Sequence, residues 1–289
     1  MKLLTLNTHS RPETAAECVM PLAALILAEQ LDVIALQEVN QSRNASVAQD
    51  TTLSLTGYHS PQGATLPIGT DNFALVLAQE LAARGAAYHW CYLPVKRGYD
   101  VYDEGLALLW RGEVENMCAL QLSTTRDYDN WRRRAALGVQ IDQTWFYSLH
   151  TSRWDDGEEP FVLQWRRLCE SLRGAGRVFL MGDFNCPADR TGEGYDRMIA
   201  DGWRDTFTSA LRTKGYRTAQ GVIDGWKDVS HPYPQRIDYI MTNDSHLRVL
   251  HARTVFDAER GECAISDHCG VLCEMALCEE GGEDQHGGA

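Results

Sequence analysis

The chain has 289 residues, of which 44% are hydrophobic and 23% charged, a composition typical of an ordinary soluble globular protein. A net charge of −13 argues against nucleic acid as the main partner, because such binding depends largely on Lys and Arg meeting phosphates. No apolar run reaches about 18 residues, and the first strand turns polar too soon for a signal peptide, so we expect neither a transmembrane helix nor a leader.

Nine cysteines are scattered along the chain, without a CxxC pair or the ligand spacing of a zinc site. We therefore expect reduced thiols in a cytoplasmic protein, because disulfides persist mainly in oxidising compartments. The only dense basic runs are Lys96-Arg97 and Arg132 to Arg134, and runs of this kind usually lie on the solvated surface. Composition thus favours a small-molecule partner over nucleic acid or a membrane.

Strands and helices alternate in the first third of the chain, and strands dominate its middle. The predicted elements are a strand over 2–7, a helix over 14–30, a strand over 33–39, a helix from about 72 to 84, strands near 87–93, 105–111, 116–122, 135–141 and 144–150, and a helix over 159–173. Residues 40–70 lack periodicity and are interpreted as a long loop. Asp71 or Asn72 is predicted to cap the helix that follows this loop.

The second half is organised around an apolar run, Val178 to Met181, which predicts a buried strand that leads directly into Gly182 to Asn185. Further predicted elements are short helices over 194–201 and 205–213 and strands near 236–242, 247–256 and 269–277. Residues 279–289 are acidic and too rich in glycine to fold, so they predict a disordered tail after a single domain over 1–278. Many strands with helices outside them favour two packed sheets flanked by helices.

Six strand-like segments carry an acid, an amide or an imidazole at or near one end. In chain order these residues are Asn7, Gln37-Glu38, His150, Asp183 with Asn185, Asp238, and Asp267-His268. One such residue is easily explained as a turn former, since Asp and Asn favour turns. Six in one chain predict a single shared site, because open α/β sheets commonly hold their chemistry at strand ends.

In this order the residues resemble the motif set of the endonuclease/exonuclease/phosphatase superfamily, which includes DNase I-like nucleases, abasic-site endonucleases, neutral sphingomyelinases and inositol polyphosphate phosphatases. The motifs are Asn7, Gln37-Glu38, Glu104-Gly105, His150, Gly182 to Asn185, Arg236 to Tyr239 and Ser266 to His268. They extend over nearly the whole chain. The resemblance implies a four-layer α/β sandwich, with two packed, mainly antiparallel sheets between helices.

The carboxylates and amides of this set suit a hard divalent cation, with Mg²⁺ the first choice and Mn²⁺ an alternative. Glu38 is the best candidate for the principal metal ligand, although alone it would be read as a surface residue after a strand. The resemblance adds Asn7 and Asp267 as further metal ligands. No cluster of Cys and His competes for this role in the sequence.

The resemblance also assigns catalytic roles. It implies that Asp238 holds the imidazole of His268, and that this pair works with Asp183 on the attacking water. A carboxylate that fixes an imidazole in one tautomer is a recurrent device in base catalysis. Asn185 would fix Asp183 or a phosphate oxygen.

Two further residues complete the implied machinery. His150 takes the position of a histidine that contacts phosphate or protonates the leaving oxygen, with a structural histidine as the alternative. Glu104 takes the position of an acid that helps to hold this imidazole, although it is also explained as a residue at the start of a strand. The implied chemistry is in-line attack of water on a phosphoester, assisted by the metal.

Several segments resemble a narrower branch, the bacterial maltose 6'-phosphate phosphatase group. They include MKLLTLNTHS, DVIALQEVNQ, GYDVYDEGLALL, FLMGDFN and RIDYIM. The loop from His150 to Trp154 lacks the Gly-Trp pair common in that group, so the sugar is left open. His9 stands where abasic-site nucleases usually have Asp, and neither long basic loops nor an apolar membrane hairpin is evident. A sugar phosphatase is favoured over a nuclease or other phosphodiesterase, and both over an inactive interaction module.

Aromatic residues in predicted loops beside the motifs suit a sugar, because aromatic faces pack against the apolar faces of sugar rings. They are Tyr99, Tyr102, Trp154 and Trp226, and burial in the core or its rim is the alternative for each. A phosphomonoester carries one more negative charge than a diester. Arg134 or Arg153 is predicted to meet that charge, unless both lie solvated on the surface. The sequence does not predict the oligomeric state.

Overall fold

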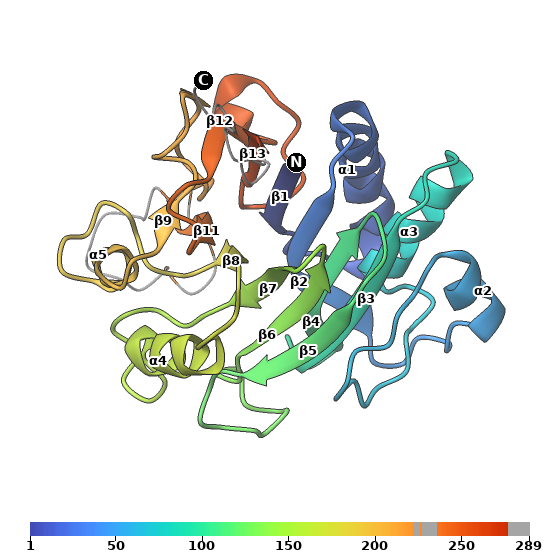
Figure 1. Ribbon diagram of the computed structural model, residues 1–289. Coiled ribbons are helices and arrows are strands. Elements are labelled where there is room, and N and C mark those ends of the chain that lie inside the picture. Colours follow the sequence, from blue (N-terminus) through green and yellow to red (C-terminus); the bar gives the residue numbers. More distant parts are fainter. Residues whose placement is uncertain (222, 224–225, 227–235, 277–289) are drawn as a thin grey trace, which may run out of the picture.

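Two β-sheets pack face to face in the computed structural model, which describes residues 1–221, 223, 226 and 236–276 (Figure 1). The seven-stranded sheet has the order β10 (Arg212–Lys214), β12 (Arg248–Val255), β13 (Gly270–Ala276), β1 (Lys2–Asn7), β2 (Val33–Ser42), β4 (Tyr102–Trp110) and β3 (His89–Gly98). The six-stranded sheet has the order β5 (Asn116–Gln121), β6 (Ala135–Ile141), β7 (Thr144–His150), β8 (Val178–Asp183), β11 (Asp238–Thr242) and β9 (Arg204–Asp205). Among these strands β1–β2, β10–β12 and β7–β8 pair in parallel and the other neighbours antiparallel, so the sheets are mainly antiparallel, as predicted.

Helices cover the outer faces of both sheets and complete four layers (Figure 1). α1 (Ala15–Glu29) and α3 (Phe73–Ala83) pack on the seven-stranded sheet through a shared apolar cluster. α4 (Phe161–Ser171) and α5 (Gly194–Ala200) pack on the six-stranded sheet. The short helices are η1 (Pro12–Thr14), α2 (Asp50–Leu55) and η2 (Ala258–Arg260). The predicted four-layer α/β sandwich is confirmed.

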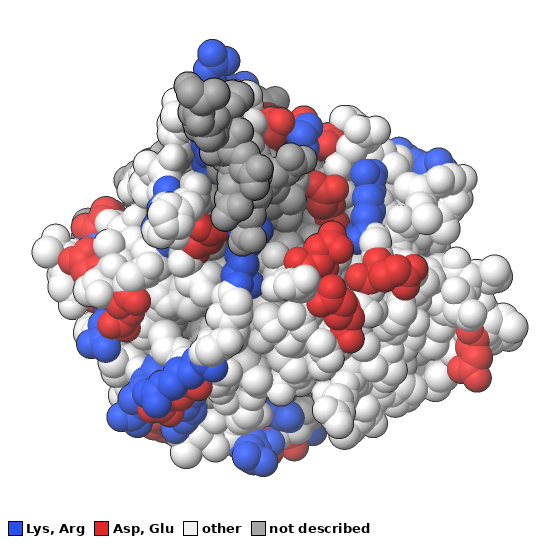
Figure 2. All heavy atoms as spheres, viewed as in Figure 1, with Lys and Arg blue, Asp and Glu red and all other residues white. Residues whose placement is uncertain are grey.

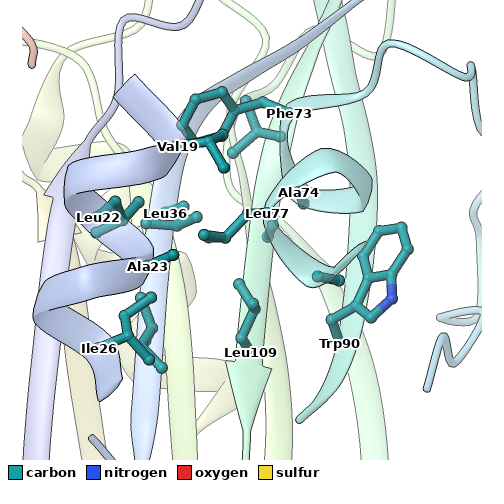
Figure 3. Close-up of a cluster of buried hydrophobic side chains, with 14 of the residues drawn as sticks. Val19, Leu22, Ala23, Ile26, Leu36, Phe73, Ala74, Leu77, Trp90 and Leu109 are labelled. Atoms are coloured by element: carbon teal, nitrogen blue, oxygen red, sulfur yellow. The ribbon is translucent and has the colours of Figure 1, made fainter. Parts of the chain in front are cut away.

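Apolar side chains fill each space between the layers. Leu22 of α1, Leu77 of α3 and Leu109 of β4 belong to one outer cluster, and Leu36 of β2 is drawn between Leu22 and Leu77 (Figure 3). Between the sheets, the rings of Phe146 and Phe179 stack with centroids 5.3 Å apart. Both faces of each sheet are therefore covered, which explains why strands such as β2 and β8 read as continuous apolar runs.

The helices of the first third follow their sequence signals closely. Asn72 caps α3, because its side-chain oxygen accepts hydrogen bonds from the backbone N–H groups of Ala74 and Leu75 at 3.0 and 3.2 Å. α1 begins at Ala15, close to the predicted start at residue 14, and Pro21 lies inside the helix. The predicted loop over 40–70 also contains the end of β2 and the short helix α2.

The predicted helix over 205–213 is wrong, because this segment contains part of β9, a turn and the start of β10. Asp205 is buried and its Oδ2 atom lies 2.6 Å from Nη1 of Arg236. The backbone N–H and the hydroxyl of Thr206 both donate to the carbonyl oxygen of Ile240. These contacts hold the segment at the edge of the six-stranded sheet and override its local helix propensity.

The eight cysteines among the described residues are free thiols, in keeping with the expectation of a reduced protein. None of the described helices is long and apolar enough to cross a membrane. The predicted tail, residues 279–289, lies outside the described residues. The interpretation of residues 1–278 as one domain therefore stays a prediction.

Candidate active site

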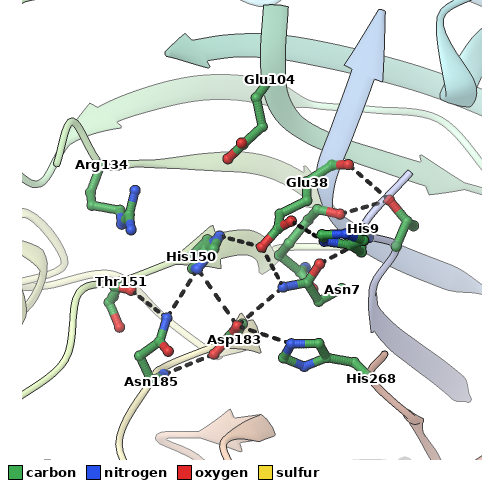
Figure 4. Close-up of polar contacts among 12 residues, drawn as sticks. Asn7, His9, Glu38, Glu104, Arg134, His150, Thr151, Asp183, Asn185 and His268 are labelled. Atoms are coloured by element: carbon green, nitrogen blue, oxygen red, sulfur yellow. Dashed lines mark hydrogen bonds and ion pairs between the residues drawn. The ribbon is translucent and has the colours of Figure 1, made fainter. Parts of the chain in front are cut away.

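Strand ends from both sheets meet at one edge of the sandwich, and each carries a polar side chain (Figure 4). β7 and β8 run parallel, so their carboxyl ends place His150 and Asp183 side by side. Asn7 ends β1 in the other sheet, and its Nδ2 atom donates to Oδ2 of Asp183 at 3.1 Å. β11 and β13 run antiparallel to β8 and β1, so Asp238 at the start of β11 and His268 just before β13 reach the same edge.

A β-bulge between Leu36 and Val39 turns Glu38 of β2 into this site. Glu38 has a φ of 49°, which non-glycine residues rarely adopt, and such strain is concentrated at functional sites. Its Oε1 atom accepts a hydrogen bond from Nδ2 of Asn7 at 2.9 Å. Burial alone would raise the pKa of Glu38, but a hydrogen bond from His9 and the nearby imidazoles hold this pKa below its ordinary value. Glu38 is therefore an ionised carboxylate.

His9 lies between two carboxylates, a position that sequence reasoning missed. Its Nδ1 atom contacts Oε2 of Glu38 at 3.1 Å and lies 4.0 Å from Oδ1 of Asp267. Its φ is 38°, and its backbone N–H donates to Oδ1 of Asn7 at 3.1 Å. The hydroxyl of Ser266 ties the Asp267 loop to β1 by donating to the carbonyl oxygen of Asn7 at 2.7 Å. Two of the three predicted metal ligands, Glu38 and Asp267, thus flank one imidazole nitrogen, and Asn7 contacts Glu38 and the backbone of His9. Their carboxylate and amide oxygens are of the kind that a divalent cation prefers.

Asp238 and His268 form the expected hydrogen-bonded pair beside Asp183. Nδ1 of His268 donates to Oδ2 of Asp238 at 3.0 Å, and Nε2 of His268 lies 3.9 Å from Oδ2 of Asp183. Burial opposes protonation of His268, but Asp238 raises the pKa of His268 to about 10. Burial and the charge of Asp238 raise the pKa of Asp183 to about 7. Ligand atoms of these three side chains lie within 4.8 Å of one another, a spacing that could hold a cation once His268 loses its Nε2 proton.

Asn185 is fixed by four hydrogen bonds or polar contacts. Its backbone N–H donates to Oδ1 of Asp183 at 2.9 Å. Its Nδ2 atom donates to the carbonyl oxygen of Thr151 at 2.9 Å and lies 3.0 Å from Nε2 of His150. Its Oδ1 atom accepts from the indole N–H of Trp226 at 3.0 Å. With a φ of 48°, Asn185 is held in one orientation between Asp183 and His150.

His150 is a neutral imidazole with a defined tautomer. Burial and the positive charge of Arg134 lower the pKa of His150 well below its ordinary value. Because the amide N–H of Asn185 faces Nε2, this ring nitrogen accepts, and the proton resides on Nδ1. Nδ1 lies 3.9 Å from Oε1 of Glu38, and Nε2 lies 3.6 Å from Oδ2 of Asp183.

Glu104 contacts Lys96, whereas the resemblance implies a contact with the imidazole of His150. Oε1 of Glu104 lies 3.0 Å from Nζ of Lys96. No hydrogen bond or ion pair joins Glu104 to His150 among the described residues (Figure 4). The cause is the register of the hairpin, which sets Lys96 of β3 directly opposite Glu104 of β4. Asn185 orients the imidazole of His150 instead.

A cavity of about 300 Å³ opens beside these side chains. Arg134, Arg153 and Tyr99, all predicted to contact substrate, line this cavity. Trp154 instead packs against the apolar cluster that contains α4. Tyr102 is buried and donates its hydroxyl to the carboxylate of Glu13 at 3.0 Å.

The predicted sugar contact of Trp226 is not supported by its position. Trp226 is only 2% exposed. The guanidinium carbons of Arg153 and Arg190 lie 5.4 and 4.9 Å from the centroid of its ring. Trp226 is therefore covered, and it supports Asn185 through the indole N–H.

An aromatic residue absent from the predictions, Trp131, lines the cavity together with Tyr99. Trp131 is 54% exposed and Tyr99 is 52% exposed. Trp131 directly precedes the basic run Arg132 to Arg134, which the sequence indicates as ordinary surface. Its place beside the cavity depends on the turn before β6, and no periodic pattern marks that turn.

Comparisons with known proteins agree with this geometry. The sequence profile of the Endonuclease/Exonuclease/phosphatase family matches residues 4–268. An endonuclease/exonuclease/phosphatase family protein from Leptotrichia buccalis is 24% identical, with a TM-score of 0.81 over 96% of this chain and 100% of that chain.

Two further solved structures share the fold at lower identity. A mannosyl-6-phosphatase from Bacteroides thetaiotaomicron is 16% identical, with a TM-score of 0.60 over 96% of this chain and 100% of that one. The 3' phosphatase NExo from Neisseria, bound to a product DNA hairpin, is 16% identical, with a TM-score of 0.61 over the same shares.

A search of curated proteins finds no match to this sequence. The family profile spans nearly the whole chain, and the motif residues within that span meet at one edge of the sandwich. The chain therefore belongs to the endonuclease/exonuclease/phosphatase family and is a phosphoric ester hydrolase.

Proposed function

We propose that the protein is a Mg²⁺-dependent phosphomonoesterase that removes the phosphate group from a sugar phosphate. The observation that supports this most is the composition of the cavity of about 300 Å³ beside the motif residues. Its lining combines the carboxylates of Glu38 and Asp183, the imidazole of His268 and the exposed rings of Tyr99 and Trp131. Hydrolytic groups and a surface for a sugar ring thus share one space.

Glu38, Asn7 and Asp267 are the residues that we propose as ligands of the cation. A divalent cation held there would neutralise charge on the phosphoryl oxygens and on the leaving oxygen. Oxygen donors favour Mg²⁺. Mn²⁺ also suits the set, because the imidazole nitrogen of His9 lies beside the same carboxylates.

Asp183 and His268 are proposed to act on the attacking water. The 3.9 Å between Oδ2 of Asp183 and Nε2 of His268 lets one water lie within hydrogen-bond reach of both atoms. Asp183 accepts a proton from that water as its oxygen bonds to phosphorus and the bond to the sugar oxygen breaks, and the leaving sugar oxygen takes a proton from solvent water. Asp238 keeps the protonated His268 in the orientation that faces the reacting groups.

His150 is proposed to donate a hydrogen bond to a phosphoryl oxygen. Its neutral state and its Nδ1 proton, set by Asn185, suit a donor to an anionic oxygen. Because the pKa of His150 is low, its imidazole is hardly ever protonated and has no spare proton to give to a leaving alkoxide. His150 therefore suits a phosphate contact better than the role of general acid.

A small substrate fits the charge of the molecule better than a nucleic acid does. On the face shown in Figure 2, Lys and Arg side chains are interspersed with Asp and Glu, and the described residues in view form no continuous basic surface. The net charge of −13 opposes the approach of a polyanion. Free thiols support a place in the reducing cytoplasm, where sugar phosphates are kept.

The experiment is a phosphate-release screen of hexose and disaccharide monophosphates in Mg²⁺ and in Mn²⁺. We expect release from at least one sugar phosphate, and a loss of about 100-fold or more in Asp183→Asn, because this change removes the proton acceptor. No release from any sugar phosphate with either metal, or full activity in Asp183→Asn, would contradict the proposal.

A further inference from the structure

Lys96 is a buried lysine beside the active-site cavity, although the sequence indicates a surface residue. Its exposure is 9%, and Nζ lies 3.0 Å from Oε1 of the equally buried Glu104. Lysine is seldom buried unless its ammonium group is paired or functional, because removing this group from water is costly. Lys96 and Glu104 both line the cavity that holds His150 and Asp183.

The hairpin of β3 and β4 is shaped to place this pair. The register shifts between Pro94 and Lys96, and this bulge re-aims the Lys96 side chain toward the cavity, opposite Glu104. Gly105 leaves room for the close strand, since a Cβ there would overlap the carbonyl oxygen of Leu93. A side chain on Gly98 would come within 3.0 Å of Oε2 of Glu104.

Arg134 supplies a second buried cation on the same side of the cavity. It is 6% exposed, and its Nη1 atom donates to the carbonyl oxygens of Trp131 and Arg133 at 2.9 and 3.3 Å. Its Nε atom is buried and has no hydrogen-bond partner among the described residues. A guanidinium with an unsatisfied buried N–H is expected to receive an anionic oxygen from a ligand.

Lys96 and Arg134 lie on one side of the cavity, and Asp183 and His268 lie on the other. Lys96 and Arg134 lie close enough that the positive charge of Arg134 adds to burial in lowering the pKa of Lys96. Glu104 forms an ion pair with Lys96, whereas Arg134 has no ion pair among the described residues. Figure 4 shows Arg134 and Glu104 on the side of His150 away from Asp183 and His268.

We propose that Lys96 and Arg134 form a subsite for the non-bridging oxygens of a phosphomonoester dianion, and that Glu104 is a positioning residue that holds Lys96. The inference rests on the proposed function, because it explains how this site selects a monoester. A dianion carries one more negative charge than a diester and matches the second cation, Arg134. A diester lacks that charge and gains less from the subsite.

The test compares Lys96→Met with wild type on p-nitrophenyl phosphate and on bis(p-nitrophenyl) phosphate, in the Mg²⁺-loaded enzyme. We expect kcat/KM for the monoester to fall about 10- to 100-fold, mainly through KM, and that for the diester to fall less than about threefold. Calorimetry should show weaker binding of inorganic phosphate by a similar factor. Lys214→Met, an exposed lysine of β10, is the matched control and should match wild type.

A double-mutant cycle separates the role of Glu104 from its predicted contact with His150. Glu104→Ala should weaken the monoester reaction in wild type and add little in the Lys96→Met background, because it acts through Lys96. Equal and additive losses on both substrates would show that Glu104 serves the shared machinery instead. Lys96→Gln takes the place of Lys96→Met if thermal melting shows that the latter does not fold.

The phosphate subsite and the proposed phosphatase activity can be contradicted separately. Equal losses on monoester and diester in Lys96→Met, with unchanged phosphate binding, would overturn the subsite while wild-type phosphatase activity stands. A wild type that hydrolyses only the diester would overturn the proposed function, whatever Lys96 does.

Discussion

Four non-glycine residues that line the site, His9, Glu38, Tyr99 and Asn185, have positive φ angles. Each such conformation costs about 1 to 3 kcal/mol and persists only where surrounding contacts determine it. Residue types at strand ends predict Glu38 and Asn185. No sequence pattern predicts their strained backbones, or Trp226 as the partner of Asn185, because these depend on contacts between distant segments.

The metal site is tested by Glu38→Gln, which keeps the shape of the side chain and removes its charge. In wild type, Mg²⁺ or Mn²⁺ should raise the Tm, because a ligand that binds only the folded state stabilises it. The variant should lose this shift and nearly all turnover. EDTA should silence wild type, and added Mg²⁺ should restore it.

The matched control for this change is Glu80→Gln, which alters an ion pair with Arg84 on the outside of α3. It should keep both the metal-induced rise in Tm and the activity. Full wild-type activity in EDTA would refute the metal assignment.

The support that Trp226 gives Asn185 is tested by Trp226→Phe. The ring stays apolar, but Oδ1 of Asn185 loses the indole N–H. We expect kcat/KM to fall roughly 5- to 30-fold, which corresponds to about 1 to 2 kcal/mol of lost transition-state stabilisation. The loss should be equal for monoester and diester, since Asn185 serves both reactions. The control is Trp154→Phe, because Trp154 packs against the cluster around α4 and away from Asn185. This change should leave kcat/KM nearly unaltered. A loss confined to sugar substrates would instead return Trp226 to the role of a sugar contact.

At the scale of elements, the site depends on strand ends and on two bulges. Strand ends were predictable, because an apolar run that stops at a polar residue marks where a buried strand leaves the sheet. The bulges in β2 and β3 were not, since one extra residue in a continuous apolar run leaves the pattern unchanged. Lys96 was interpreted as surface because it lies in a basic run, and the resemblance assigned Glu104 to His150; the register of β3 and β4 instead sets the two residues opposite each other. The same limit explains the wrong helix over 205–213, where pairing with β11 decides the structure.

The packing of α3 on the seven-stranded sheet is tested by Leu77→Ala. Leu77 is fully buried between α1 and the sheet, so its truncation leaves a cavity (Figure 3). We expect the free energy of unfolding in urea to fall by about 2 to 5 kcal/mol. Leu55→Ala, at an exposed position of α2, is the matched control and should change it by less than about 0.5 kcal/mol. Equal small effects at both positions would contradict the assigned core.

At the scale of the whole molecule, two features act together on substrate choice. The four-layer sandwich joins the ends of strands from two sheets into one cavity, which a single sheet would leave open on one side. The net charge of −13 opposes the approach of a polyanion, and under the proposal the buried cations beside His150 would attract a small dianion locally. The net charge can be read from the composition alone. The buried cations required the register of β3 and β4 and the position of Arg134.

The central claim is tested most directly by kcat/KM for a hexose or disaccharide monophosphate relative to bis(p-nitrophenyl) phosphate, measured in one Mg²⁺ buffer beside supercoiled plasmid. The account predicts that at least one sugar phosphate is preferred by about tenfold or more and that the plasmid stays intact. Robust nicking of the plasmid, with no phosphate released from any sugar phosphate, would contradict it.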